Sequence, residues 1–269
     1  MRTFNAGKFV LDLDKKTYVM GILNVTPDSF SDGGKWNTVE TAVAHALQMQ
    51  GDGADIIDVG AQSTRPGCVR ISPEEELARL MPVLQDLRPQ IRVPISVDTF
   101  YPAVAKEALA AGADIINDVT GFKDAEMIDV ASGSDCGCMI MHDGPLNQMK
   151  AFFEEQIAKL SKRGVQECRI CVDPGIGFGK SYEENLCAIK NFKNYVADGV
   201  AVLVGASRKR VIGTPCGDPP FEERMPGTIA AHTIAILNGA NIIRVHDVKE
   251  AVQASKVADA ILRAEIADE

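Results

Sequence analysis

The feature that most constrains the fold of this chain is a regular alternation of short apolar runs with longer Ala-rich stretches of helical periodicity. Near-continuous apolar runs of this length are typical of strands buried on both faces of a parallel sheet. Several of the longer stretches reach a glycine just before the next run, as at Gly112, Gly164 and Gly239, which is typical of helix C-termini. Eight apolar runs follow one another: Val19–Asn24, Asp55–Gly60, Val93–Asp98, Asp114–Val119, Cys138–His142, Arg169–Asp173, Ala201–Gly205 and Asn241–His246.

Eight strand–helix units without a break in composition favour an α/β fold, a single-domain (β/α)8 TIM barrel over residues 1–269, which is a usual length for it. An open, doubly wound sheet is the alternative. It would need a Gly-rich turn after the first strand, whereas the chain continues there into the long polar segment Asn24–Gly34. Residues Phe4–Leu13 alternate around a glycine and are expected to form an N-terminal β-hairpin that closes one mouth of the barrel. The predicted helices are Thr38–Gly51, Ser72–Leu87, Pro102–Ala111, Met149–Arg163, Tyr182–Tyr195, Thr228–Leu237 and Glu250–Ala264. The last of them carries an apolar stripe, Val252, Val257, Ile261 and Leu262, which is expected to pack against the barrel.

The net charge of −9 argues against nucleic acid as a partner, because a protein of this sign repels phosphates through its overall field. No apolar segment resembles a signal peptide or approaches the roughly 20 residues that span a bilayer, so we expect a cytoplasmic protein without membrane contact. The seven cysteines are an odd number, which fits free thiols in a reducing compartment. Cys168 and Cys171, like Cys136 and Cys138, have spacings that a metal or redox pair could use. Buried thiols are the simpler interpretation, because no zinc-type set of ligands surrounds them.

Polar residues stand at or just after the end of nearly every predicted strand. One such residue is often only a helix cap or a turn residue, but polar groups on seven of eight strands are harder to explain in that way. In a barrel the carboxyl ends of all strands meet at one mouth, where enzymes of this fold keep their active sites. The sequence therefore predicts one active site, lined by these residues: Asn24, Gly60, Asp98, Asn117, Asp118, His142, Asp173, Ser207, Arg208, Lys209, Arg244 and His246.

Two kinds of chemistry can be distinguished among these side chains. Asp98, Asn117 and Asp173 follow or interrupt apolar runs, and a carboxylate in such a place needs hydrogen-bond donors. A flat heterocycle with amide-like and amino edges would supply them, since a carboxylate accepts two parallel N–H bonds. Arg244 also interrupts an apolar run, near the end of the eighth predicted strand, and the basic turn 207–210 follows the seventh. Barrels usually bind phosphate in the loops after these two strands. We therefore expect an anionic substrate.

Three loops at this mouth, Thr26–Trp36, Gln62–Arg70 and Pro174–Lys180, are expected to be mobile and to carry binding residues. Arg65 in the second loop adds a further cation. The glycine spacing of the third loop resembles a phosphate loop only weakly and is not interpreted as one.

Segments from all eight strands, in order, match one known family. They are Met20–Gly34, Ile56–Gly60, Ser63–Gly67, Ile95–Thr99, Ile115–Asp118, Met141–His142, Asp173–Lys180, Ser207–Lys209 and Ile243–Val248. In these segments the chain resembles the dihydropteroate synthase family of folate biosynthesis. The resemblance extends over nearly the whole chain.

The resemblance implies the family's reaction, in which p-aminobenzoate is joined to the methylene carbon of 6-hydroxymethyl-7,8-dihydropterin diphosphate and pyrophosphate leaves. It also implies Mg²⁺ as cofactor, contacted by Asn24, and a homodimer. The catalytic residues it implies are Asp98, Lys209, Arg244 and His246. The binding residues carried over are Asp98, Asn117, Asp173 and Lys209 for the pterin ring, Asn24, Thr64, Arg65, Arg244 and His246 for the diphosphate, and Arg65, Pro66, Phe178, Ser207 and Arg210 for p-aminobenzoate.

The residue types agree with this chemistry. Cations and Mg²⁺ neutralise the charge that develops on a leaving pyrophosphate. The electron-rich pterin can then carry positive charge on its methylene carbon, which favours an SN1-like path, and Asp98 or another carboxylate of the pocket would stabilise that cation. The aniline nitrogen attacks without needing a strong base, so no covalent enzyme intermediate is expected.

Two other functions share part of this pattern. A barrel that transfers a methyl group from methyltetrahydrofolate to a corrinoid protein would share the pterin pocket, but it has no need of the turn Ser207–Lys209 or of Arg244 and His246. A paralogue that only binds pterin would have lost some of the catalytic residues, and all are present. The departures from the family pattern are small: Gln62 stands where many relatives carry Glu. No insertion interrupts residues 175–180, so sulfonamides, which mimic p-aminobenzoate, are expected to inhibit the enzyme.

Overall fold

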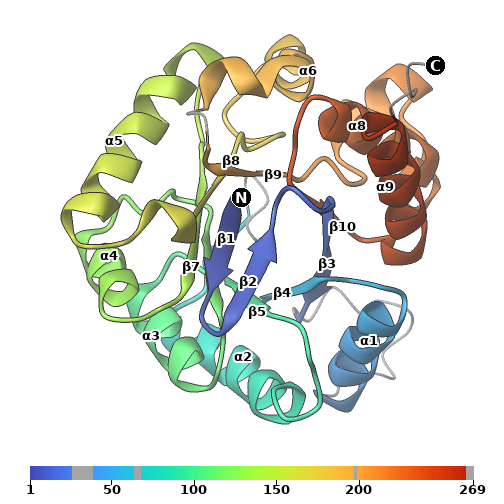
Figure 1. The fold of residues 1–269 in the computed structure, drawn as a ribbon. Helices are drawn as coiled ribbons and strands as arrows, with labels where there is room; N and C mark the ends of the chain where they lie inside the picture. Colours follow the sequence, from blue (N-terminus) through green and yellow to red (C-terminus); the bar gives the residue numbers. More distant parts are fainter. Residues whose placement is uncertain (26–38, 64–67, 197–198, 265–269) are drawn as a thin grey trace, which may run out of the picture.

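A closed parallel barrel forms the centre of the molecule. The computed structural model describes residues 1–25, 39–63, 68–196 and 199–264. Eight parallel strands close in the order β10-β3-β4-β5-β6-β7-β8-β9, and helices surround them (Figure 1). The predicted barrel is confirmed, and each strand begins and ends within two residues of its predicted bounds. The barrel strands are β3 (Tyr18–Asn24), β4 (Ile56–Gly60), β5 (Ile95–Asp98), β6 (Ile115–Asp118), β7 (Gly137–Met141), β8 (Ile170–Asp173), β9 (Ala201–Val204) and β10 (Ile242–Val245).

The outer helices include all seven that the sequence predicts, together with two short helices that it does not. The first addition is α4, whose eight residues are too few for their periodicity to stand out between Gly121 and Gly133. The second is the single turn α7 after β9. The α-helices are α1 (Val39–Gly51), α2 (Pro73–Leu87), α3 (Pro102–Ala110), α4 (Ala125–Ser132), α5 (Met149–Lys162), α6 (Tyr182–Asn191), α7 (Arg210–Gly213), α8 (Met225–Leu237) and α9 (Val248–Leu262), and short 3-10 turns are η2 (Leu146–Gln148), η3 (Glu167–Arg169), η4 (Phe192–Tyr195), η5 (Thr214–Cys216) and η6 (Phe221–Arg224).

Side-chain caps fix where two of these helices begin. Ser72 accepts a hydrogen bond from the backbone of Glu75 at the start of α2, and a proline follows as the first helical residue, where its missing N–H costs nothing. At the start of α6, Ser181 and Glu184 form a reciprocal capping box. Both helices follow loops at the carboxyl ends of strands, so these caps define where the candidate site's loops end.

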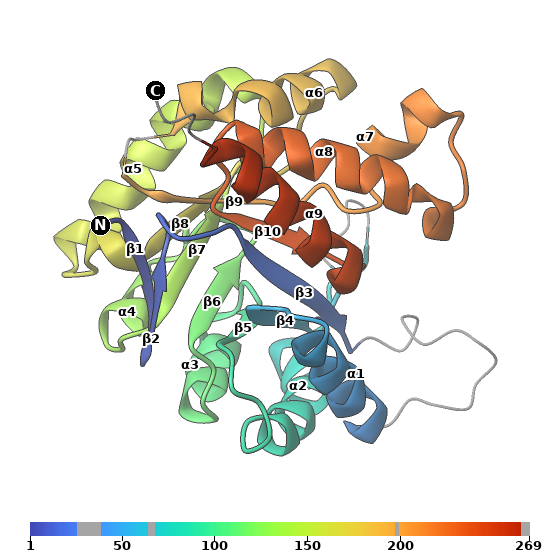
Figure 2. The ribbon, with the colours of Figure 1, turned by 45° about the vertical axis from the view of Figure 1, so that its right-hand side comes forward.

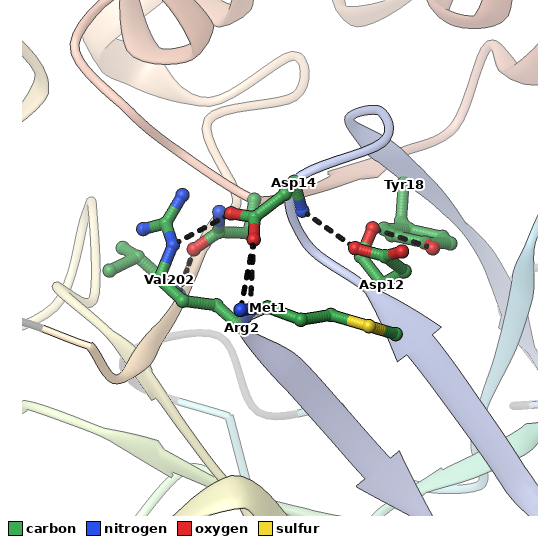
Figure 3. Close-up of polar contacts among 7 residues, drawn as sticks. Met1, Arg2, Asp12, Asp14, Tyr18 and Val202 are labelled. Atoms are coloured by element: carbon green, nitrogen blue, oxygen red, sulfur yellow. Dashed lines mark hydrogen bonds and ion pairs between the residues drawn. The ribbon is translucent and has the colours of Figure 1, made fainter.

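The predicted N-terminal hairpin is present and covers one mouth of the barrel. Strands β1 (Thr3–Ala6) and β2 (Phe9–Asp12) pair antiparallel around Gly7, whose φ of 57° suits glycine. The hairpin lies across the opening in Figure 1, and Figure 2 shows β3 and β10 running away from it. Figure 3 shows how the hairpin is held: Asp14 accepts two hydrogen bonds from Arg2. The carboxyl ends of the strands therefore form the one mouth that the hairpin leaves uncovered.

The pleat of the strands divides their side chains between two cores. Residues such as Ile57 and Val59 point outward and pack against the helices. Met20, Ile56 and Cys171 point inward and form, with side chains of the hairpin, a separate apolar cluster inside the barrel. Inward positions further along each strand lie nearer the uncovered mouth. That is where the polar side chains of the candidate site begin.

Helix α9 carries a surface that the sequence interpretation assigned wrongly. We expected the stripe Val252, Val257, Ile261 and Leu262 to pack against the barrel. Val252 does pack against the outer core, but Val257, Ile261 and Leu262 are at least half exposed. The face that α9 buries is made largely of small and polar residues, among them Ala251, Ser255 and Ala258.

Two further expectations concern a pairing of cysteines and a membrane-spanning helix. All seven cysteines are free, and Cys171 is buried inside the barrel while Cys168 is half-buried outside it, so they form no pair. Among the described residues, no helix is both long enough and apolar enough to span a membrane.

Candidate active site

The floor of the candidate site is a cluster of charged and polar side chains from β4, β5, β6 and β10. Arg244 donates from Nε to Oδ2 of Asp58 over 2.7 Å and from Nη2 to Oδ2 of Asp98 over 3.0 Å. Asn117 donates from Nδ2 to the same Asp58 oxygen over 3.2 Å. Four strands thus contribute one side chain each to a single hydrogen-bonded cluster. Their inward orientation places the cluster inside the barrel, with Asp98 and Asn117 at or next to the carboxyl ends of their strands and Asp58 in the middle of β4.

Two carboxylates share one guanidinium in this cluster, and this arrangement shifts the pKa values of Asp98 and Arg244. Asp58 is 0% exposed and Asp98 is 5% exposed. Burial raises the pKa of Asp98 to about 7; Arg244 opposes this rise and Asp58 adds to it. Burial alone would lower the pKa of Arg244, but the two carboxylates outweigh it, so the guanidinium stays charged. Oδ1 of Asp98 is buried without a partner among the described residues and can accept a hydrogen bond from a ligand.

A second carboxylate and a second cation form the wall on the side of β8 and β9. The ammonium group of Lys209 donates to the carbonyl of Ile176 over 2.6 Å and lies 4.8 Å from the ring centroid of Phe178. Burial lowers the pKa of Lys209 to about 8, against the opposing effect of Asp173. Burial likewise raises the pKa of Asp173, whose Oδ1 accepts from the backbone N–H of Gly175. The wall therefore offers a carboxylate and a cation that lie close enough to influence each other's pKa.

The loop after β8, predicted to be mobile, is tied to its surroundings at several points. Lys180 donates to the carbonyls of His142, Gly175 and Phe178 over 3.0, 3.3 and 3.2 Å. A side chain at Gly175 would lie 2.1 Å from the carbonyl oxygen of His142, so glycine is needed there. The loop that these contacts hold also carries Ile176 and Phe178, the two residues that Lys209 contacts.

The turn after β9 joins the end of β10 through a serine–histidine contact. The hydroxyl of Ser207 lies 2.9 Å from Nδ1 of His246 and also accepts from the His246 backbone N–H. The His246 ring packs edge-on against Phe221 at 5.2 Å between centroids. Arg208, with a φ of 56°, forms a two-point ion pair with Asp247, so its guanidinium already has an anionic partner within the protein.

Asn24 is the described residue best placed to contact a metal ion. It ends β3 beside Gly60 of β4, and a side chain at Gly60 would meet both the Asn24 amide oxygen and the Asp98 carboxylate. An amide oxygen is a suitable ligand for Mg²⁺, which usually takes one or two protein oxygens and completes its shell with water and substrate phosphates. Within the described ranges there is no cluster of three or more His, Cys, Asp or Glu side chains that could hold a metal ion.

The remaining predicted residues either lie outside the described residues or lie apart from this cluster. Thr64, Arg65 and Pro66, and the predicted mobile loop Thr26–Trp36, lie outside the described residues. Arg210 is exposed and begins α7, and its side chain has no hydrogen bond or ion pair with a described residue. His142, which we counted among the residues lining the mouth, is only 2% exposed and packs beside the ring of Phe152 at 5.1 Å.

Two buried acidic residues of the candidate site, Asp58 and Glu76, are not among the site residues predicted from the sequence. Asp58 interrupts the apolar run of β4 just as Arg244 interrupts that of β10, and the same reasoning could have found it. Glu76 of α2 is 0% exposed and accepts from the amide of Gln62 over 2.8 Å. Its burial could not be foreseen, because it stands among three consecutive glutamates at the start of a helix.

Comparison with known proteins agrees with this site. The family described as pterin binding enzyme matches residues 20–246, and the chain belongs to that family. Dihydropteroate synthase of Clostridium beijerinckii is 43% identical over 266 residues, which cover 96% of this chain and 98% of the relative. Dihydropteroate synthase of Bacillus subtilis is 45% identical over 260 residues, covering 94% and 91%. The activity of the protein is accordingly that of a dihydropteroate synthase, a transferase that forms 7,8-dihydropteroate and pyrophosphate.

Solved structures support the same conclusion. Xanthomonas albilineans dihydropteroate synthase with 4-aminobenzoic acid superposes with a TM-score of 0.90 at 42% identity, over 95% of this chain and 96% of that one. The Yersinia pestis enzyme in complex with a sulfonamide drug superposes with a TM-score of 0.91 at 36% identity, over 97% of this chain and 100% of that one.

Proposed function

We propose that Asp98, Asn117, Asp173 and Lys209 hold the pterin ring at the bottom of the barrel mouth. The observation that carries this proposal is the buried Oδ1 of Asp98, which has no partner among the described residues although it lies beside a charged guanidinium. A buried acceptor without a donor is costly, and the N–H groups of a pterin would satisfy it. Asp173 offers a second acceptor and Lys209 a donor on the opposite wall.

The diphosphate is proposed to bind nearer the solvent, at the ends of β3 and β10. Arg244 uses Nε and Nη2 for Asp58 and Asp98, while its Nη1 group has no partner among the described residues. His246 is oriented by the hydroxyl of Ser207. Asn24 would contact Mg²⁺ and Thr64 and Arg65 would complete the clamp. Bound Mg²⁺ would neutralise charge on the diphosphate.

The reaction then follows from where these groups sit. Arg244 and His246 stabilise negative charge as the bond from the methylene carbon to the diphosphate oxygen breaks. The carboxylate of Asp98, which accepts a hydrogen bond from Arg244, would stabilise the positive charge left on the pterin. The amino group of p-aminobenzoate forms the new C–N bond and then releases a proton. Arg65, Pro66, Phe178, Ser207 and Arg210 are proposed to form the p-aminobenzoate pocket.

These assignments can be tested by following pyrophosphate release with the pterin diphosphate, with and without p-aminobenzoate and Mg²⁺. We expect release of pyrophosphate coupled to dihydropteroate formation only when all three are present. Asp98→Asn and Lys209→Met should lose affinity for the pterin diphosphate while binding of p-aminobenzoate changes less. Unchanged pterin affinity in both variants would refute the proposed pocket.

We also propose a homodimer formed through α8 and α9. Ile234 and Leu237 of α8 are 48% and 44% exposed, and Val257, Ile261 and Leu262 of α9 are 51–63% exposed. The two helices are neighbours in Figure 1, so these side chains gather in one area of the surface, and apolar surface of this kind marks interaction sites.

We also propose a cellular location and a class of inhibitor for the enzyme. Seven free thiols support a reducing, cytoplasmic location. The Yersinia pestis relative binds a sulfonamide drug, and we expect sulfonamides to compete with p-aminobenzoate here. A competitive pattern in steady-state inhibition would support this assignment, and a pattern independent of p-aminobenzoate would contradict it.

A further inference from the structure

Asp58 occupies an unusual position for a carboxylate. It lies in the middle of β4, in register with Ile22 on one side and Ser96 on the other. Its side chain points into the barrel, because Ile57 and Val59 on either side of it belong to the outer core. It is fully buried. A buried carboxylate is retained only when partners offset its loss of hydration.

The partners of Asp58 are two of the residues proposed to bind substrate. Its Oδ2 accepts from Nε of Arg244 over 2.7 Å and from Nδ2 of Asn117 over 3.2 Å. One oxygen atom therefore fixes the orientation of a guanidinium from β10 and an amide from β6. Without it, Arg244 would keep only the single bond from Nη2 to Asp98 and could rotate about it. Asn117 would lose its only side-chain hydrogen bond among the described residues.

We propose that Asp58 is a positioning residue, which aims Arg244 and Asn117 at the substrate and shares the guanidinium with Asp98. This inference rests on the roles proposed above for Arg244 and Asn117. Asp58 lies one inward position below Gly60, the residue paired with Asp98, so it supports the substrate-binding layer from beneath. A misplacement of about 1 Å in such a layer can cost about 10²-fold in rate.

The same residue also sets the charge that Asp98 experiences. The ionisable groups that act on Asp98 are Arg244 of β10, Asp58 of β4, Glu76 of α2 and Asp118 of β6, together with Lys209 after β9. Asp58 is one of the three that raise the pKa of Asp98. Removing its charge should therefore lower that pKa. An acid limb in the pH profile of kcat/KM that reports ionisation of Asp98 should then move to lower pH.

The test compares Asp58→Ala, Asp58→Asn, Arg244→Ala and Ser96→Ala in the full chain. Ser96 is a matched control, since it is buried in the same layer on the adjacent strand and its hydroxyl has no hydrogen-bond partner in the part of the chain that the structure describes. Kinetic constants for both substrates, the pH profile of kcat/KM and thermal unfolding are measured for each. In Asp58→Ala we expect kcat to fall about 10²-fold with little change in KM for p-aminobenzoate, and in Ser96→Ala a kcat close to wild type.

Asp58→Asn separates geometry from charge. The amide oxygen can still accept from Arg244, so kcat should recover in part relative to Asp58→Ala. The acid limb should move down by about one pH unit because the charge is gone. A folded Asp58→Ala with wild-type kcat, or an Asp58→Asn whose acid limb stays in place, would overturn the inference. Arg244→Ala distinguishes failure of the proposed function from failure of this inference. If Arg244→Ala and Asp58→Ala both have normal turnover, the proposed role of Arg244 fails. If Arg244→Ala is impaired and Asp58→Ala is normal, only the role of Asp58 is refuted.

Discussion

Replacing Glu76 with glutamine should make the protein more stable, and increasingly so as the pH rises. Glu76 is fully buried at the start of α2. Burial raises its pKa from 4.5 to about 7, although hydrogen bonds from Thr99 and Gln62 and the charge of Arg79 oppose the rise. Gln62 can donate to a glutamine oxygen as it does to the carboxyl group. The substitution therefore keeps the hydrogen bond and removes only the ionisation.

The size and sign of the effect follow from linkage between proton binding and folding. Below pH 4.5 the carboxyl group is protonated in both the folded and the unfolded chain, so it contributes nothing. Between pH 4.5 and 7 the unfolded chain ionises first, and the folded state loses stability as the pH rises. Above pH 7 the loss is complete. A pKa of about 7 against an ordinary value of 4.5 corresponds to about 3 kcal/mol.

Thermal unfolding at a series of pH values measures this effect. For a chain of this size the advantage in Tm of Glu76→Gln over wild type should grow by about 5–10 °C between pH 5 and pH 8. Glu75→Gln is the matched control, because Glu75 is the preceding residue on the same helix and is exposed in an ion pair with Arg79. A Tm difference between Glu76→Gln and wild type that is the same at both pH values would refute the reasoning.

The other predictions concern the candidate active site and the proposed dimer surface. Arg244→Ala should lower kcat/KM by about 10²-fold, since it removes charge stabilisation of the leaving group, and it should lower Tm because Asp58 and Asp98 lose their shared cation; normal steady-state kinetics would contradict this. Chelation with EDTA should abolish pyrophosphate release and added Mg²⁺ should restore it, and activity that persists in EDTA would exclude the metal. Lys209→Met should raise KM for the pterin diphosphate about tenfold or more, as loss of a charged hydrogen bond does. Ile261→Glu should yield a monomer in sedimentation velocity, and a dimer that survives the change would place the interface elsewhere.

Most of the barrel could be predicted from the sequence because each strand is buried on both faces and each must therefore be apolar. That pattern located every strand to within two residues. It also located Asp98, Asn117, Asp173 and Arg244, because a polar residue in a buried apolar run is costly unless it has hydrogen-bond partners. Helix α4 was missed since its eight residues carry little periodicity.

The parts that could not be predicted depend on contacts between distant segments. Arg208 looked like an anion ligand, but a left-handed backbone turns it toward Asp247. The stripe on α9 was expected to be buried because its residues are apolar, but Val257, Ile261 and Leu262 are exposed. A hydrophobic pattern alone does not say which face of a helix lies against the barrel. Small residues such as Ala251 and Ala258 allow close packing of the other face, which leaves the larger side chains outside.

The closure of the barrel between β3 and β10 has a consequence for how the chain folds during synthesis. Tyr18 of β3 pairs with Ile242 of β10, and Thr17 donates two hydrogen bonds to Asp259 of α9. Strand β3 is made before these partners, so one of its edges stays open until β10 and α9 have left the ribosome. Contacts so far apart in sequence form slowly, and open strand edges favour aggregation meanwhile. The first strand of the barrel is thus among the last to be secured, and it is the segment that a chaperone would have most reason to protect.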